Sequence, residues 1–352
     1  MSLAAAIKTG DTDLLPSRRD EDWRWTDLRG LLRSLPAPSP TGGLPVGTGP
    51  FAWLDDHIIL NGYGEKAIKL FAGEERVVSV RFIAGPDAGT HSTDLAVHLG
   101  EGASLVLLET YEGSAAGYLS DVSLAFTLAG DARLERIVIA EDGPDGVCVS
   151  TATAHLGAGA AFAQTVLTTG AKRQRLETRV IHPGAGADVR LDGVYLLADR
   201  RHADITTVVT HEGVNGTTRQ LVKGMVRDQS RAVFQGRIVV SPGADQTDAR
   251  MGHHALILGD RAEVDAKPEL EIWADDVACA HGNTVGALDA EALFYAAQRG
   301  IPDGEARAML TTAFVGEVID RIEHDAARNI ARAWVDRQLT PAPAPCHIGE
   351  GG

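Results

Sequence analysis

From about residue 55 to residue 280 the chain repeats short runs of apolar and β-branched residues, separated by small or polar ones. No helical periodicity intervenes between these runs, and glycine-containing turns bound many of them. Such a pattern predicts short β-strands without intervening βαβ helices. The clearest runs are Val77–Val80, Leu105–Leu108, Arg136–Ile139, Val194–Leu197, Arg237–Val240 and Ala255–Leu258.

Small-residue turns precede many of the runs at a regular spacing. The turns close on alanines at positions 103, 132, 160, 187, 232 and 262, which are 29, 28, 27, 45 and 30 residues apart. A period of this length is typical of stacked repeats that bury their apolar faces against one another. The interval of 45 fits one and a half turns if each coil has two faces of about 15 residues. We therefore predict a β-solenoid with unpaired strand edges only at its ends.

The remaining pattern divides the chain into segments. Trp23 and Trp25 lie in an otherwise polar run and are expected to anchor an N-terminal cap onto the solenoid. The predicted segments are an N-terminal helical region (1–35, broken at Pro16), a Pro/Gly-rich linker (36–54), a β-helix core (55–286), a C-terminal helical region (287–338) and a disordered tail (339–352).

Two helices are predicted after the solenoid. The first covers residues 288–299, with Asp289 as its N-cap and Gly300 as its stop signal. The second begins at an N-cap residue, Asp303, and carries Glu305 in its first turn. Its apolar stripe comprises Ala306, Met309, Leu310, Ala313, Phe314, Val318, Ile319 and Ile322.

Composition narrows the function. The 352 residues carry a net charge of −15, which disfavours nucleic acid as a partner because phosphate binding needs a basic surface. The three cysteines form no close pair, the start lacks a signal-peptide pattern, and no apolar run approaches the ~18 residues of a membrane span. We expect a cytoplasmic protein that binds neither nucleic acid nor membrane.

Common catalytic signatures are missing. The chain has no G-x-x-x-x-G-K-[ST], so we expect no ATP site in it, and it has no G-x-S-x-G, H-E-x-x-H or C-x-x-C. Glu269 and Glu271 alternate as on a solvated strand face, rather than as a catalytic pair. These features favour a protein that is not an enzyme.

The main chemical candidates are Cys279 and His281, two residues apart where the strand pattern ends. In an extended strand they share one face, and a sulfur ligand beside an imidazole suits iron, zinc or sulfur chemistry. Two ligands do not complete a site. The pair is therefore either structural or completed by a second surface.

Other cysteines and histidines are weaker candidates. His253 and His254 are neighbours in a predicted strand, so at most one of them shares a face with another site. Cys148 is expected to be a small buried apolar residue. Cys346 and His347 lie in the proline-rich tail, where we expect them to be surface residues.

From Phe234 onward the chain resembles the SufB/SufD family of iron–sulfur cluster assembly proteins. Its short length, its lack of a multi-cysteine N-terminal region and its Cys-Ala-His-Gly sequence resemble the SufD-like branch, although Ala280 stands where serine is expected. The resemblance rests on Glu21–Leu28, Phe234–Ile238, Gln246–Ala249, Lys267–Ile272, Asp275–Gly282, Leu293–Tyr295, Arg299–Ile301, Glu305–Arg307 and Phe314.

This resemblance implies a mainly β fold, a right-handed parallel β-helix flanked by N-terminal and C-terminal helical regions. It implies a non-catalytic scaffold subunit of the SUF machinery that pairs with SufB through the β-helix end and binds the ATPase SufC through its C-terminal helices. A nascent iron–sulfur cluster is then shared transiently with SufB near Cys279 and His281, with flavin binding left open. The implied ATPase-facing residues are Leu293, Phe294, Tyr295, Arg299, Gly300, Glu305, Arg307 and Phe314.

Two alternatives remain. A cytosolic β-helix enzyme acting on carbohydrate fits the solenoid, but aromatic residues for sugar stacking make up only 5% of the chain. A purely structural homodimer, joined edge to edge through the solenoid ends, fits the predicted free edges. An isolated chain of this type is also expected to form such a homodimer when its partner is missing.

Overall fold

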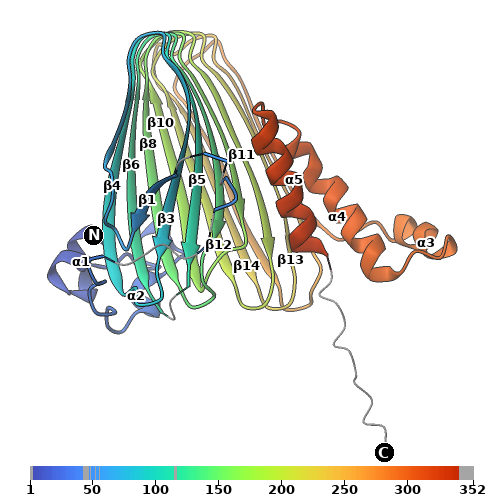
Figure 1. Ribbon diagram of the computed structural model, residues 1–352. Helices are drawn as coiled ribbons and strands as arrows, with labels where there is room; N and C mark the ends of the chain where they lie inside the picture. The colour runs from blue at the N-terminus through green and yellow to red at the C-terminus, as the bar shows by residue number, and fades with distance from the viewer. Residues whose placement is uncertain are drawn as a thin grey trace, which may run out of the picture.

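The chain folds into a parallel β-solenoid of two facing sheets, with short helices at its N-terminal and C-terminal ends (Figure 1). The computed structural model describes residues 3–42, 47, 49–51, 53–54, 56–114 and 117–340. Part of the predicted linker and most of the predicted tail, including Cys346 and His347, lie outside the described residues. Within them, no helix has the length and apolar character needed to cross a membrane.

Strands alternate between the two sheets, and all strand neighbours run parallel. The first sheet holds, in spatial order, β1 (Asp56–Leu60), β3 (Glu75–Ala84), β5 (Ser104–Gly113), β7 (Arg133–Glu141), β9 (Ala161–Thr168), β11 (Asp188–Leu197), β13 (Thr217–Val226), β15 (Asp248–Ile257) and β17 (Ala278–Gly286). The second holds β2 (Ala67–Leu70), β4 (Thr90–Leu99), β6 (Leu119–Leu128), β8 (Val147–Leu156), β10 (Arg173–His182), β12 (His202–His211), β14 (Arg231–Val240) and β16 (Glu263–Ile272).

The alternation accounts for the irregular interval in the sequence repeat. Ala187 immediately precedes a strand of the first sheet, whereas Ala232 lies in a strand of the second. The step of 45 residues therefore moves half a coil further than the others, and the predicted two-faced β-solenoid is confirmed.

One corner of the solenoid is a column of tight turns that needs left-handed backbone. Successive coils place a residue with positive φ at this corner, and the glycines among them adopt it without a Cβ clash. Each such residue donates its backbone N–H to a carbonyl in the turn of the next coil, as Gly102 does to Gly130 at 2.9 Å and Gly159 does to Ala185 at 2.9 Å. The column comprises Gly73, Gly102, Asp131, Gly159, Gly186, Asn215 and Gln246.

Apolar side chains fill the space between the sheets, with a few polar groups paired among them. Glu109 is fully buried there and accepts from Nε and Nη2 of Arg136, both at 2.7 Å. Cys148 is also buried in this core, as predicted, and burial raises its thiol pKa. The interior is therefore a packed core rather than an open channel.

Three C-terminal helices follow the last strand, α3 (Ala290–Gln298), α4 (Asp303–Ile319) and α5 (Asp325–Leu339), where two were predicted. α4 and α5 pack on the outer face of the first sheet through a cluster that includes Val315, Trp334 and Leu196. Asp289 caps α3 as predicted, but α4 has Pro302 at its N-cap, so the prediction of Asp303 there was wrong. Met309, expected on the apolar stripe, is 54% exposed because the sheet-facing side of α4 is set by Val315, Val318 and Ile319.

The N-terminal segment crosses the outer face of the second sheet. It contains α1 (Leu3–Thr9), the 3-10 turns η1 (Thr12–Leu14) and η2 (Glu21–Trp23), and α2 (Leu28–Leu31). Trp23 stacks on the guanidinium of Arg175 in β10, 4.5 Å from the ring centre. The backbone carbonyl of Trp25 lies 3.2 Å from Nε2 of His202 in β12. Both tryptophans thus help to attach the cap, the first by its ring and the second by its backbone.

Candidate functional site

Cys279 and His281 lie in β17, the last strand of the first sheet. The register places Cys279 beside Ala249 and His281 beside Met251, and both β15 neighbours are buried core residues. Because parallel neighbours in register point the same way, Cys279 and His281 lie on the face of β17 that continues the solenoid interior. Cys279 is half-buried and His281 is exposed. No further coil follows β17 in the part of the chain that the structure describes, so the core-facing side of this strand is open there.

Beneath this open face lies a column of polar side chains. Tyr195 Oη and His253 Nε2 are 3.0 Å apart, and His253 Nδ1 is 2.7 Å from Asn283 Oδ1. Phe234 stacks on the His253 ring at 4.7 Å between ring centres. Burial lowers the pKa of His253 to about 4, so the ring is neutral at neutral pH. Its Nδ1–H then donates to Asn283, and its Nε2 accepts from Tyr195.

His254 points to the opposite face, as the strand pattern predicted. Its Nδ1 lies 2.7 Å from Oγ1 of Thr284 in β17. The register places it beside Lys223, whose ammonium is 2.5 Å from the Glu317 carboxylate of α4. Polar side chains of β17, β15 and β13 therefore lie next to one another on the outer face, and Lys223 links β13 to α4.

The chemistry of the Cys279 thiol depends on what approaches it. Burial raises its pKa, with the nearby Asp248 carboxylate acting in the same direction and a backbone hydrogen bond from Ala249 opposing both. The thiol is therefore protonated at neutral pH, and a bound cation is needed to favour the thiolate. Among the described residues, no three His, Cys, Asp or Glu side chains gather as a metal site. Cys279 and His281 by themselves therefore do not form a complete metal site.

Exposed apolar side chains surround this end of the solenoid. Trp273 is 68% exposed just after β16, and Val285 of β17 is 46% exposed. β16 and β17 are the last strands of their sheets, so each also presents an edge with unpaired backbone groups. Apolar patches and open edges of this kind mark interaction surfaces.

A second exposed apolar surface lies on the C-terminal helices. α3 has no buried residue and projects away from the sheets (Figure 1), with Phe294 67% and Tyr295 58% exposed. Beside it, an open groove of about 910 Å³ lies along α4 and the end of α5, lined by Met309, Ala313 and Leu339 among others.

The predicted ATPase-facing residues lie in α3, directly after it and in α4, and most of them are exposed. Phe294, Tyr295 and Arg299 are exposed on α3, where the Arg299 guanidinium lies 4.6 Å from the Tyr295 ring centre. Gly300 ends α3 with φ of 78°, and Leu293 is half-buried. In α4, Glu305 is exposed and lines the groove, and Arg307 is exposed and paired with Asp303 at 2.7 Å. Phe314 instead turns to the first sheet, beneath the Lys223 ammonium.

Sequence reasoning missed two of the partners beneath the site, Asn283 and Tyr195. Asn283 lies two residues beyond His281 on the same strand face, which i+2 spacing alone could have indicated. Tyr195 joins the column through coil-to-coil stacking, which no local pattern indicates, whereas the sequence already makes His253 a candidate from its place in a predicted strand.

Comparison with known proteins shows the family to which the chain belongs. The family described as SUF system FeS cluster assembly, SufBD core domain, matches residues 82–314. The chain is 31% identical over 266 residues to the iron–sulfur cluster assembly protein SufD of Escherichia coli, covering 73% of this chain and 61% of that protein. It is 27% identical over 363 residues to an iron–sulfur cluster assembly SufBD family protein of Mycobacterium leprae, covering 93% of this chain and 91% of that protein.

A SufBD family protein of Synechocystis is 30% identical over 205 residues, covering 58% of this chain and 45% of that protein. The chain therefore spans less than two thirds of the Escherichia coli and Synechocystis relatives. The family match nevertheless covers most of the solenoid and reaches into the C-terminal helices. The chain belongs to the SufBD family of SUF-system iron–sulfur cluster assembly proteins.

Proposed function

We propose that this chain is a SufD-like, non-catalytic scaffold subunit whose open solenoid end docks a SufB-type subunit and shares a nascent-cluster site with it. The observation that carries the proposal is the position of Cys279 and His281 on the uncovered, core-facing side of β17. A docked subunit that continues the stack covers this face and supplies the ligands that the chain lacks. The iron–sulfur cluster is the cargo of this site.

The surroundings of the site support a transient role. The raised pKa of Cys279 keeps its thiol protonated until a cation approaches, so the residue releases a proton when it binds. His281 is exposed and offers an imidazole nitrogen, a ligand type suited to iron. Asn283, fixed by His253, orders the strand next to the imidazole. Two ligands from this chain leave the remaining ligands to the docked subunit, so the site is complete only while the two subunits are together.

The second part of the proposal concerns the C-terminal helices. Phe294 and Tyr295 on α3, together with the apolar groove that includes Met309, form a docking surface for a SufC-type ATPase. The chain itself carries no P-loop signature, so ATP hydrolysis has to come from the partner. The surface combines apolar side chains with two charged ones, Arg299 and Glu305, which can pair with charges on the partner.

A line of neighbouring polar side chains offers a route between the two surfaces. Glu317 of α4 pairs with Lys223 of β13, Lys223 lies in register with His254 of β15, and His254 contacts Thr284 of β17. In our proposal, ATP-driven movement of α4 shifts this line of contacts and opens or closes the ligand face of β17. Family membership favours this assembly role over the carbohydrate-active alternative.

Hydrogen exchange tests the docking end. Adding a SufB-type subunit should slow amide exchange in β16 and β17, because their edges become paired, while β2 at the opposite end keeps its free rate. Protection confined to β2, or none in β17, would contradict the proposal. A homodimer through the same open end is the competing occupant. If the isolated chain forms this homodimer, it elutes as a dimer in size-exclusion chromatography. Replacement of the homodimer by a complex with the SufB-type subunit then supports the proposal.

Copurification tests the ATPase surface. Replacing both Phe294 and Tyr295 with alanine should abolish capture of a SufC-type ATPase, since both side chains are more than half exposed and have little part in folding. Phe71→Ala is the matched control, because Phe71 is 69% exposed at the other end of the solenoid. Equal capture by the double variant and the control would refute this docking surface.

A further inference from the structure

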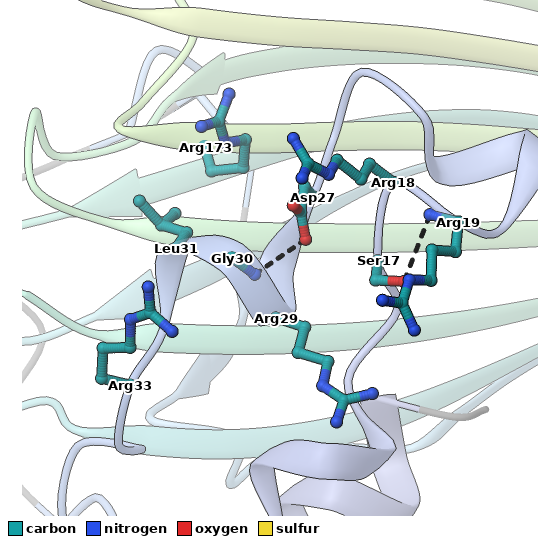
Figure 2. A pocket seen from close by; sticks show the side chains of 9 residues that line it. All are labelled: Ser17, Arg18, Arg19, Asp27, Arg29, Gly30, Leu31, Arg33 and Arg173. Carbon is teal, nitrogen blue, oxygen red and sulfur yellow. Dashed lines mark hydrogen bonds between the residues drawn. The ribbon is translucent and has the colours of Figure 1, made fainter.

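A hollow on the N-terminal cap gathers positive charge on a chain whose net charge is −15. It measures about 610 Å³ and opens to solvent between the cap and the start of β10 (Figure 2). Arginine is the commonest residue around it, with a single acidic side chain among the rest. The lining residues are Ser17, Arg18, Arg19, Asp27, Arg29, Gly30, Leu31, Arg33 and Arg173.

Most of these arginines are not neutralised by the protein. Arg29 pairs with Asp13 at 2.6 Å. Among the described residues, no carboxylate forms an ion pair with Arg18, Arg19 or Arg33. All three are exposed at the rim. The hollow therefore keeps a surplus of guanidinium donors.

Arg173 is the least satisfied of the group. It is half-buried at the start of β10, and its Nε is buried without a hydrogen-bond partner in the described part of the chain. The lining carboxylate, Asp27, already caps α2 by accepting from the Gly30 backbone N–H at 2.7 Å. Burial and the positive charge of Arg231 lower the pKa of Arg173, and the Asp27 and Asp204 carboxylates act in the opposite direction. An anion that enters the hollow and accepts from the buried Nε–H stabilises the charged guanidinium further.

Size and lining restrict the anion. The volume falls within the usual range of roughly 300–1,000 Å³ for small-molecule sites. Guanidinium groups bind phosphate oxygens in a bidentate way, and several arginines around one hollow favour more than one phosphate. No aromatic side chain among the described residues lines the hollow, so these residues offer no stacking surface for a base. A net charge of −15 disfavours long polyanions such as nucleic acid.

We propose that this hollow binds a compact polyanion with two or more phosphate groups, recognised through its phosphates alone. Arg173 contacts it from the sheet side, while Arg18 and Arg33 close over it from the cap. The site is separate from the open end of the solenoid and does not depend on the proposed function.

Calorimetric titration of the full chain with pyrophosphate tests the site. We expect saturable binding to the wild type and at least about tenfold weaker binding to the double variant Arg18→Gln/Arg33→Gln, since the variant removes two guanidinium groups that donate charge-assisted hydrogen bonds to phosphate oxygens. Both side chains are exposed and unpaired, so the variant should melt as the wild type does. Arg200→Gln/Arg261→Gln is the control, because it removes the same charge from exposed sites outside the hollow.

Further ligands distinguish the sources of the phosphate. ADP and GDP should bind with similar affinity and compete with pyrophosphate, and orthophosphate should bind more weakly. The proposal is overturned if the wild type does not bind pyrophosphate at about 1 mM or if the control pair weakens binding equally. Binding of ADP but not GDP also overturns it, as does displacement of pyrophosphate by an equal concentration of an acidic peptide.

Discussion

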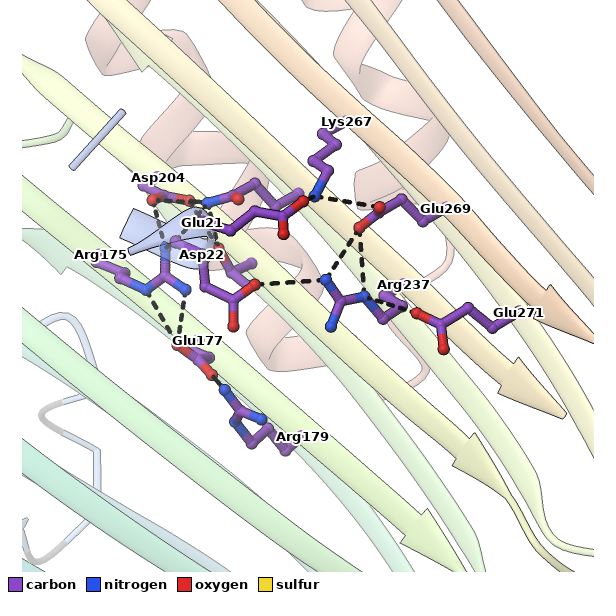
Figure 3. Close-up of polar contacts among 12 residues, drawn as sticks. Glu21, Asp22, Arg175, Glu177, Arg179, Asp204, Arg237, Lys267, Glu269 and Glu271 are labelled. Carbon is purple, nitrogen blue, oxygen red and sulfur yellow. Dashed lines mark hydrogen bonds and ion pairs between the residues drawn. The ribbon is translucent and has the colours of Figure 1, made fainter. Parts of the chain in front are cut away.

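One of the side chains that hold the N-terminal cap on the sheet is a buried arginine, Arg175, which is fully shielded from solvent. It donates to Asp204 at 2.7 Å, to Glu177 at 2.8 and 3.0 Å, and to the backbone carbonyl of Asp22 at 2.8 Å (Figure 3). Arg175→Met keeps much of the volume but leaves the Asp204 carboxylate buried without a cation. Breaking a buried ion pair in this way costs roughly 3–5 kcal/mol of unfolding free energy.

A control variant lies on the same strand. Arg179 pairs with the other oxygen of Glu177 but is 44% exposed, so Arg179→Met should cost only about 0–1 kcal/mol. Adding Asp204→Asn to Arg175→Met should restore part of the loss, because it removes the unpaired charge. Urea unfolding followed by circular dichroism measures the differences, and limited proteolysis reports release of residues 3–35. The reasoning is refuted if Arg175→Met lies within about 1 kcal/mol of Arg179→Met.

Three further predictions follow from buried groups. Glu109→Gln should lower the urea-unfolding free energy by roughly 3–5 kcal/mol because Arg136 keeps a buried charge, and Glu109→Leu with Arg136→Met should recover most of it. Trp334→Ala should lower the free energy of unfolding by about 3–5 kcal/mol, because it leaves a cavity under α5. Trp334→Phe should lower it less, because phenylalanine fills more of the space and the buried Nε1–H that is lost has no acceptor among the described residues. Burial lowers the pKa of His202 in the folded protein to about 3. As the pH drops from about 6.5 toward 3, His202 is protonated in the unfolded chain but not in the folded one, so the free energy of unfolding falls. His202→Gln should make that fall shallower, measured as urea midpoints at about pH 7 and about pH 5.

Each of these three has a contradicting result. No recovery in the double variant would show that the Glu109–Arg136 pair is not the cause of the loss. Equal losses for both Trp334 variants would mean that cavity size does not set the cost. An unchanged pH dependence in His202→Gln would show that this ring does not titrate on unfolding in the stated range.

Local periodicity predicted the strands, the two-sheet solenoid and the shared face of Cys279 and His281, because side-chain alternation is a property of the strand itself. It also predicted the first C-terminal helix with its Asp289 cap. The third helix was missed even though Ala327, Ala331, Trp334 and Val335 follow helical spacing. In this helix, α5, charged residues separate the apolar ones, which hides the apolar stripe in the sequence.

Other features depend on which coils stack together. The column of Tyr195, His253 and Asn283 draws on strands far apart in the sequence. The arginine-lined hollow likewise joins Arg173 to a cap more than a hundred residues earlier in the chain. Such sites require the register between coils, which local patterns do not carry.

The central claim is that His281 is a ligand in a site completed by a second subunit. Iron and acid-labile sulfide, measured on the complex reconstituted with SufB-type and SufC-type partners, test it most directly. His281→Ala should lose most of the bound iron and sulfide while the complex still assembles. His155→Ala, which removes an exposed histidine from β8, should retain both. Full iron and sulfide content in the His281→Ala complex would contradict the account.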